Sequence, residues 1–219
     1  MGFTEKDGVL HADNVPLDRL ADRYGTPAYI YSAGQITNNV KNLQSALDEI
    51  LPAAAQPLIA YACKANSNLA ILKLLGTMGL GCDVVSGGEL LRTQKAGIPA
   101  NKVVFSGVGK TDSEILFALE SGVRQINVES RPELERIAAL APKTGKKAVV
   151  ALRFNPDVDA GTHAKITTGK RDNKFGMAES DIRKAFADMK DHPDIDLCGL
   201  SIHIVSQLTT FTPYEQAFS

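Results

Sequence analysis

The feature that most constrains the fold is a series of short, apolar, β-branched runs separated by helical stretches. Most of these runs lack a strict alternation of apolar and polar residues, which indicates strands buried on both faces. A parallel sheet with helices packed outside it has this pattern. Six strands are predicted, over residues 58–63, 82–85, 103–105, 125–128, 148–152 and 197–203.

Helix starts are predicted directly after three of these strands. In each case a hydroxyl residue is followed three positions later by glutamate, as in Ser86 with Glu89, Thr111 with Glu114 and Ser130 with Glu133. In such a capping box the two side chains satisfy the first free amides of the helix reciprocally. Gly97 and Gly122 stand where the helices over 87–96 and 113–121 should end, because glycine suits a helix C-cap.

The spacing of the strands predicts a (β/α)8 barrel. The first five predicted strands end at intervals of roughly 20 to 25 residues, which suits successive βα units. A complete barrel of this kind needs about 250 residues, whereas the chain has 219 residues and six predicted units. We therefore expect about six of eight units, with the chain stopping inside a helix that starts near Pro213. The polar segment 155–176 is predicted to be a long loop at the C-terminal face.

The start of the chain is predicted to differ from the barrel. Residues 1–35 should form an N-terminal segment with a helix over 16–24 and a strand over 27–31, and residues 36–219 should form the partial barrel. A helix over 36–50 is predicted from apolar residues at helical spacing.

Charge and cysteine usage exclude several classes of protein. Lys+Arg 24 and Asp+Glu 25 give a formal charge of −1, which leaves no basic surface for nucleic acid or an anionic membrane. No apolar run approaches the ~18 residues of a membrane span and no export signal starts the chain, so a cytoplasmic location is expected. Three cysteines without CxxC spacing predict neither a disulfide framework nor a metal site, and Cys63, Cys82 and Cys198 are expected to be buried free thiols.

Two glycine-containing segments resemble nucleotide-binding motifs, but neither matches the complete motif. Residues 106–111 end like a phosphate-binding loop, but Val104 stands where that loop needs its first glycine. Residues 79–84 begin like a dinucleotide fingerprint, but Val84 replaces the third glycine and the glycines precede a strand. Neither motif is expected to bind a nucleotide.

Polar residues gather at the predicted strand ends. Lys64 follows the first strand, where burial would leave its amine nucleophilic and able to form a Schiff base, unless the side chain simply extends into solvent. Asp83, Arg153, His203 and Ser206 stand at or just beyond other strand ends. Because strand ends of a barrel meet at one mouth, we expect these side chains to surround one ligand. The alternatives are a structural pair of Asp83 with Arg153 and a histidine buried in the core.

Several segments in order along the chain carry a resemblance to a known family. The chain resembles the alanine-racemase-like, pyridoxal-phosphate-dependent decarboxylases, and among them the diaminopimelate decarboxylases. The matching segments are Tyr61–Asn66, Asp83–Leu90, Val128–Ser130, Arg153–Pro156, Lys174–Gly176 and Ser201–Leu208.

The resemblance implies a pyridoxal-phosphate-binding barrel of the alanine racemase type and roles for individual residues. Lys64 would hold the cofactor, His203 would pack on its ring, and these two would be catalytic. Ser206 would bind the phosphate, and Asp83 with Arg153 would form a polar pair beside the lysine. The implied reaction is the decarboxylation of meso-2,6-diaminopimelate to L-lysine and carbon dioxide.

The resemblance also implies a homodimer for the full-length protein and an amino acid as substrate. The family's glycine-rich phosphate loop, its acid for the pyridine nitrogen, its substrate-binding arginine and its C-terminal β domain are expected beyond Ser219. Two alternatives stay open. One is a related decarboxylase acting on ornithine, arginine or carboxynorspermidine, and the other is a non-catalytic cofactor-binding barrel protein.

Overall fold

The computed structural model describes residues 2–156, 158, 175–204 and 210–218. The chain divides into two compact units, Met1–Leu58 and Ile59–Ser219, each of which is described by itself. The predicted division between residues 35 and 36 stays a prediction.

The first unit begins with a small antiparallel sheet that the sequence analysis missed. Its strands are β1 (Phe3–Lys6), β2 (Val9–Ala12) and β3 (Val15–Pro16), in that order. Between β1 and β2, Asp7 and Gly8 have φ of 52° and 77°. An Asp-Gly pair with two left-handed residues is the preferred two-residue hairpin turn, so this signal was available in the sequence.

Two α-helices complete the first unit, α1 (Leu17–Tyr24) and α2 (Ala33–Ile50), followed by the short 3-10 helix η1 (Ala53–Ala55). Both α-helices were predicted. The predicted strand over 27–31 is wrong, because this segment has no regular secondary structure. Tyr29 is 93% exposed, and the strand preference of tyrosine depends on a half-buried sheet surface that is missing here.

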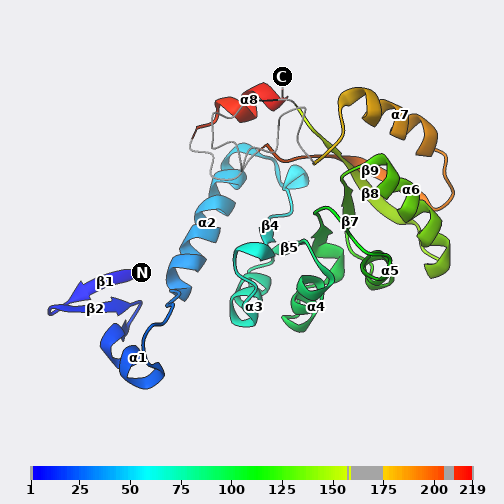
Figure 1. The fold of residues 1–219 in the computed structure, drawn as a ribbon. Helices are drawn as coiled ribbons and strands as arrows, with labels where there is room; N and C mark the ends of the chain where they lie inside the picture. The colour runs from blue at the N-terminus through cyan, green and yellow to red at the C-terminus, as the bar shows by residue number, and fades with distance from the viewer. Residues whose placement is uncertain (1, 157, 159–174, 205–209, 219) are drawn as a thin grey trace. The chain divides into compact units, whose positions relative to one another are not determined.

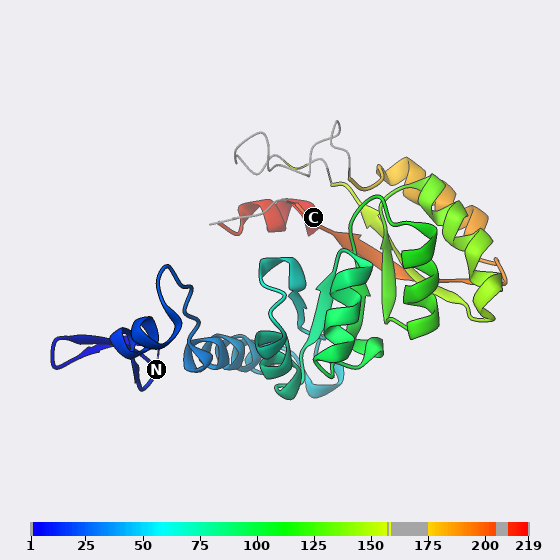
Figure 2. The same ribbon diagram turned by 60° about the horizontal axis from the view of Figure 1, so that its bottom comes forward.

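The second unit contains a parallel sheet of six strands in sequential order. Its strands are β4 (Ala60–Ala62), β5 (Gly81–Val84), β6 (Val103–Phe105), β7 (Gln125–Val128), β8 (Ala148–Phe154) and β9 (Ile195–Ile202). The helices are α3 (Leu69–Thr77), α4 (Gly87–Lys95), α5 (Asp112–Ser121), α6 (Arg131–Leu140), α7 (Glu179–Met189) and α8 (Thr212–Phe218), with 3-10 helices η2 (Cys63–Ala65), η3 (Ala100–Lys102) and η4 (Ala141–Thr144). Strands and helices alternate along this unit (Figures 1 and 2). All six predicted strands and the partial barrel are confirmed.

The core of the second unit lies between the sheet and its helices. Val84, Phe105 and Val128 are fully buried in one hydrophobic cluster with Leu90 and Leu134 of the helices. Because side chains alternate along a strand, the residues next to these core positions face the other side of the sheet. Asp83 and Asn127 are such residues, so the sheet itself directs polar groups to the inside of the barrel.

The three predicted capping boxes form in two different ways. Thr111 and Glu114 bond reciprocally, as predicted. Ser86 and Ser130 each accept the amide of their glutamate. Their glutamate carboxylates instead accept the amide one residue before the cap, that of Val85 or of Glu129, at 2.8 Å in both cases. Both helices end at the predicted glycines: Gly122, with φ of 72°, is the C-cap of α5, and Gly97, with φ of 81°, directly follows Ala96, the C-cap of α4.

The cysteines are free, as predicted, but only two are buried. Burial raises the pKa of Cys63 to about 11 and that of Cys82 to about 12. Cys198 is exposed, contrary to the prediction, because its strand β9 pairs with a described neighbour on one side only. Among the described residues, no group of three or more metal-binding side chains comes together. The described helices also include none that is long and apolar enough to cross a membrane.

Candidate active site

A cavity of about 360 Å³ opens where the six parallel strands end. Every one of these strands, or the turn directly after it, contributes to the wall. The lining residues are Lys64, Asp83, Val85, Ser106, Gly107, Asn127, Glu129, Arg153, Phe175, Ser201, Ile202 and His203. The predicted convergence of strand ends on one mouth is therefore present in the structure.

Four of the five predicted site residues lie in this wall: Lys64, Asp83, Arg153 and His203. Ser206 lies outside the described residues, as does most of the predicted loop over 155–176. The expected burial of Lys64 is wrong, since its side chain is exposed. It stands on η2, two residues past the end of β4, so the strand no longer covers it. Its amine therefore borders the cavity without being enclosed by it.

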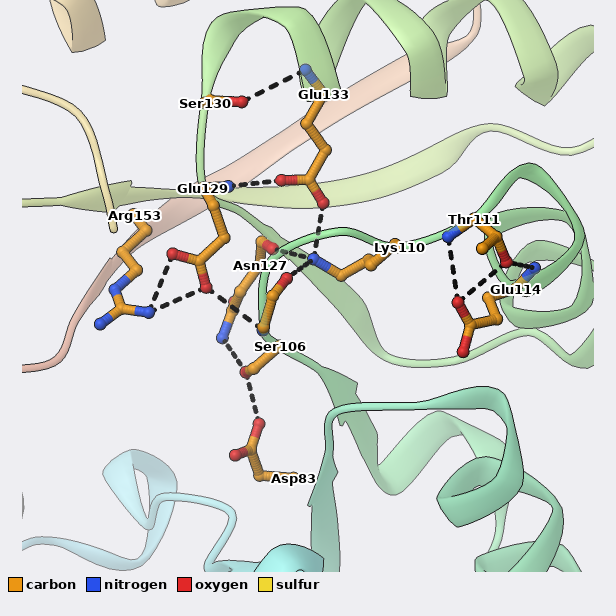
Figure 3. Close-up of polar contacts among 11 residues, drawn as sticks. Asp83, Ser106, Lys110, Thr111, Glu114, Asn127, Glu129, Ser130, Glu133 and Arg153 are labelled. Atoms are coloured by element: carbon orange, nitrogen blue, oxygen red, sulfur yellow. Dashed lines mark hydrogen bonds and ion pairs between the residues drawn. The ribbon is translucent and has the colours of Figure 1, made fainter. Parts of the chain in front are cut away.

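Asp83 is held by a line of hydrogen bonds across three strands (Figure 3). The Ser106 hydroxyl donates to Oδ1 of Asp83, and Nδ2 of Asn127 donates to Oγ of Ser106 at 2.9 Å. Gln125 continues the line by donating to Oδ1 of Asn127 at 2.9 Å. Burial raises the pKa of the Asp83 carboxyl, while the Ser106 bond and the positive charge of Lys64 act in the opposite direction.

Arg153 takes a different partner from the one expected. Its Nη1 donates to both carboxylate oxygens of Glu129, each at 2.8 Å. The amide of Gly107 donates to the same carboxylate at 3.2 Å, and the guanidinium lies 5.4 Å from the centre of the Phe175 ring. Asp83 and Arg153 thus line the same cavity without forming the expected pair. Asp83 accepts a hydrogen bond from Ser106, and Arg153 donates to Glu129.

His203 follows β9 and presents an imidazole to the cavity. Desolvation by the surrounding protein atoms lowers its pKa, and the positive charges of Arg153 and Lys64 lower it further. The neutral imidazole is therefore favoured in the site. The alternative of a histidine buried in the core is wrong, because the side chain is exposed.

Four polar residues of the wall have no role assigned from the sequence, although two of them lie in segments that carry the resemblance: Ser106, Asn127, Glu129 and Ser201. Ser106 and Glu129 are the first residues after β6 and β7. A position directly after a strand is also what indicates Lys64, so the same rule could have identified them. Asn127 and Ser201 lie inside strands, where only the direction of the side chain reveals their role. The buried hydroxyl oxygen of Ser201 has no hydrogen-bond partner among the described residues.

The chemistry of the wall suits a small ligand with an electrophilic carbonyl and further polar groups. An exposed primary amine can attack such a carbonyl. The neutral imidazole of His203 offers a flat surface, and the Ser201 hydroxyl, which has no hydrogen-bond partner within the described part of the chain, can bond to a ligand.

Comparison with known proteins identifies the type of domain. Residues 33–219 match the family model described as "Pyridoxal-dependent decarboxylase, pyridoxal binding domain". The chain is 46% identical over 215 residues to diaminopimelate decarboxylase of Zymomonas mobilis, covering 98% of this chain and 51% of that protein. It is 47% identical over 209 residues to the enzyme of Neisseria meningitidis serogroup B, covering 95% and 49% respectively.

Solved structures give the same result. Diaminopimelate decarboxylase of M. jannaschii in complex with L-lysine superposes with a TM-score of 0.90 at 38% identity, covering 98% of this chain and 50% of that one. The Helicobacter pylori enzyme with L-lysine has a TM-score of 0.86 at 39% identity and covers 92% and 50%. The chain spans about half the length of the curated relatives it matches.

Proposed function

The chain belongs to the pyridoxal-dependent decarboxylases, and from this premise we propose that the protein decarboxylates meso-2,6-diaminopimelate to L-lysine and carbon dioxide. The observation that carries the proposal is the convergence of Lys64, Asp83 and His203 on one cavity, within the domain that matches the pyridoxal-binding model. Relatives at 46% and 47% identity named diaminopimelate decarboxylase favour this substrate over ornithine or arginine.

The residues of the cavity fit pyridoxal phosphate as the cofactor. The volume of about 360 Å³ lies within the range of about 300–1,000 Å³ typical of small-molecule sites. Lys64 supplies an amine for the aldehyde and His203 a flat neutral ring for stacking. Ser201 supplies a hydroxyl that no other described residue bonds. Ser206 is proposed to bind the phosphate.

When bound, the cofactor supplies an electron sink for the carbon that loses carbon dioxide. The chain's own residues prepare the site for it. Asp83 and Lys64 border the same cavity, and the positive charge of Lys64 lowers the pKa of the Asp83 carboxyl against the effect of burial. His203 in its neutral form avoids adding a further cation beside Arg153 and Lys64. Phe175 and Ile202 add apolar surface to the wall, which limits access of water.

The test is carbon dioxide release by the complete gene product, supplied with pyridoxal phosphate and one amino acid at a time. Release from meso-diaminopimelate, with little from ornithine, arginine or carboxynorspermidine, supports the proposal. Preference for one of the other three substrates would assign the protein to a related decarboxylase. A cofactor-loaded protein that releases no carbon dioxide from any of them would be a binding protein without this activity.

We further propose that the protein acts in the cytoplasm as a homodimer. The free thiols of Cys63, Cys82 and Cys198 support a reducing compartment. The dimer rests on the resemblance to the decarboxylase family alone. Light scattering of the purified gene product tests it, and a monomer mass would contradict it.

A further inference from the structure

Lys110 is a buried lysine that does not line the cavity. Its side chain is 1% exposed, and it belongs to the segment that resembles a phosphate-binding loop and fails as one. The ammonium donates to the carbonyl of Gly107 at 2.6 Å, to the carbonyl of Asn127 at 2.9 Å and to Oε1 of Glu133 at 2.6 Å (Figure 3). An ammonium has three donors, so these bonds use all of them. Lys110 therefore acts inside the protein and not on a ligand.

Each partner of Lys110 leads to a side chain of the cavity wall. Gly107 donates its amide to Oε1 of Glu129 at 3.2 Å, and Oε2 of Glu133 accepts the amide of Glu129 at 2.8 Å. Glu129 in turn holds Arg153. The Lys110 ammonium thus reaches Glu129 by two routes, one through the turn after β6 and one through the first turn of α6.

The third partner leads to the other half of the wall. Lys110 holds the main-chain carbonyl of Asn127, whose side chain donates to Ser106, and Ser106 donates to Asp83. One buried cation therefore connects to both carboxylates that face the cavity, Asp83 and Glu129.

The charges of the network alternate in sign. Lys110 pairs with Glu133 at 2.6 Å, and Arg153 pairs with Glu129 at 2.8 Å. The side chains of all four residues are at most 12% exposed. Buried charges of this kind are tolerated only when each has a partner, and removing one partner leaves the other uncompensated. Lys110 is therefore the cation that allows Glu133 to stand beside Glu129.

Gly107 shows why the turn after β6 needs such an anchor. Its φ of +92° is left-handed, and a Cβ there would lie 3.3 Å from Cβ of Val85. Position 107 therefore has no side chain that could hold the turn in place by contacts of its own. The bonds to Lys110 and Glu129 fix the carbonyl and the amide of Gly107 instead.

We propose that Lys110 is a positioning residue of the active site, which together with Glu133 fixes the main chain at Gly107 and Asn127 and so orients Glu129 with Arg153 and Ser106 with Asp83. The inference depends on the proposed function in one respect only, namely that pyridoxal phosphate is the ligand of the cavity. The competing explanation is that Lys110 merely neutralises the buried Glu133.

Two variants separate these roles. Lys110→Met preserves most of the volume but leaves the Glu133 carboxylate buried without its cation, so a loss of stability is expected from either role. The double variant Lys110→Met/Glu133→Gln removes both charges and keeps an oxygen that can accept the amide of Glu129. As a matched control, Lys102→Met removes another lysine of the same unit, one that donates to the carbonyl of Gly79 at 2.9 Å and does not line the cavity.

The first measurement is the dissociation constant of pyridoxal phosphate, followed by absorbance, alongside the melting temperature. In the double variant we expect a higher melting temperature than in Lys110→Met, because no buried charge is left unpaired. Its cofactor affinity should be lower by on the order of 10- to 100-fold, the scale seen when outer partners of metal-binding side chains are removed. Lys102→Met should bind the cofactor like the wild type. A double variant that binds within about twofold of the wild type would show that Lys110 only balances charge.

The second measurement does not depend on the cofactor. Hydrogen exchange followed by peptide mapping should show faster exchange in the double variant over residues 105–111 and 127–133, with the rest of the sheet unchanged. Unchanged exchange in these two segments would overturn the inference. If the wild type itself binds no pyridoxal phosphate, the proposed function fails, while the exchange data still decide the role of Lys110.

Discussion

Glu129 and Arg153 form a buried ion pair in which both carboxylate oxygens accept hydrogen bonds from Nη1 of the arginine, each at 2.8 Å. The sheet places the two residues side by side. Val128 of β7 is the register partner of Leu152 of β8, and Glu129 and Arg153 each follow by one residue. The parallel pairing of β7 with β8 therefore brings opposite charges together at the cavity.

We expect Glu129→Gln to lower the free energy of unfolding by about 3 kcal/mol or more, because Arg153 would remain buried without its anion. Glu129 is 2% exposed and Arg153 is 12% exposed, so solvent cannot replace the lost partner. Chemical denaturation of the variant and the wild type measures the difference.

A surface pair provides the control for this experiment. Arg131 and Glu135 lie 3.0 Å apart on α6, where both side chains are well exposed. Glu135→Gln should cost less than about 1 kcal/mol. An equal loss of unfolding free energy in Glu129→Gln and Glu135→Gln would show that burial does not strengthen the dependence of Arg153 on Glu129.

Lys64 is expected to carry the cofactor. After incubation with pyridoxal phosphate, borohydride reduction and peptide mapping should place the adduct on Lys64, the lysine whose amine borders the cavity. Lys64→Met should remove the adduct, whereas Lys73→Met, a change on α3 away from the cavity wall, should retain it. An adduct on Lys73 or Lys110 in the wild type would contradict the assignment.

The ionisation of Asp83 should make stability depend on pH. Burial raises its pKa above the ordinary value of 3.8, so the folded protein binds this proton more tightly than the unfolded chain. Stability then falls as pH rises from the unfolded pKa through the folded pKa. Asp83→Asn should therefore become more stable relative to the wild type as the pH rises from about 4 through the folded pKa of Asp83. Denaturation at several pH values measures this.

Ser106→Ala tests the cause of this effect. The Ser106 hydrogen bond lowers the pKa of Asp83, so losing it should raise that pKa further and extend the pH window upward. A constant stability difference between Asp83→Asn and the wild type across this pH range would show that the carboxyl is not perturbed.

The sequence was sufficient to predict where the site lies. Apolar runs of regular spacing indicated parallel strands, and parallel strands end on the same side of a sheet. Lys64, Asp83, Arg153 and His203 could thus be assigned to one mouth from their positions alone, and the structure places all four in one wall.

The partners of these residues could not be predicted in the same way. Asp83 bonds to Ser106 and Arg153 to Glu129 because of strand register and side-chain direction, which a single sequence does not encode locally. In the sequence, Lys110 is distinguished only as part of the segment 106–111, which fails as a phosphate-binding loop. Its carbonyl acceptors at Gly107 and Asn127 belong to main chain brought together by the fold.

Both edge strands of the parallel sheet, β4 and β9, are open on one side among the described residues. Leu200 of β9 is 59% exposed, and an apolar cavity of about 660 Å³ lies between β9 and α7. Open strand edges beside apolar surface promote pairing with other chains.

We therefore expect the 219-residue chain, expressed alone, to self-associate and to show no useful decarboxylase activity. Size-exclusion chromatography with light scattering, together with carbon dioxide release from meso-diaminopimelate, measures both properties. Leu200→Lys should reduce the associated fraction, because a charged residue on an edge strand disfavours edge-to-edge pairing. Lys146→Gln is the matched control, since it changes a charged residue away from the sheet edge, one that donates to the carbonyl of Glu120. A monodisperse monomer that turns over substrate like a full-length homologue would show that the open edges do no harm and that six units suffice.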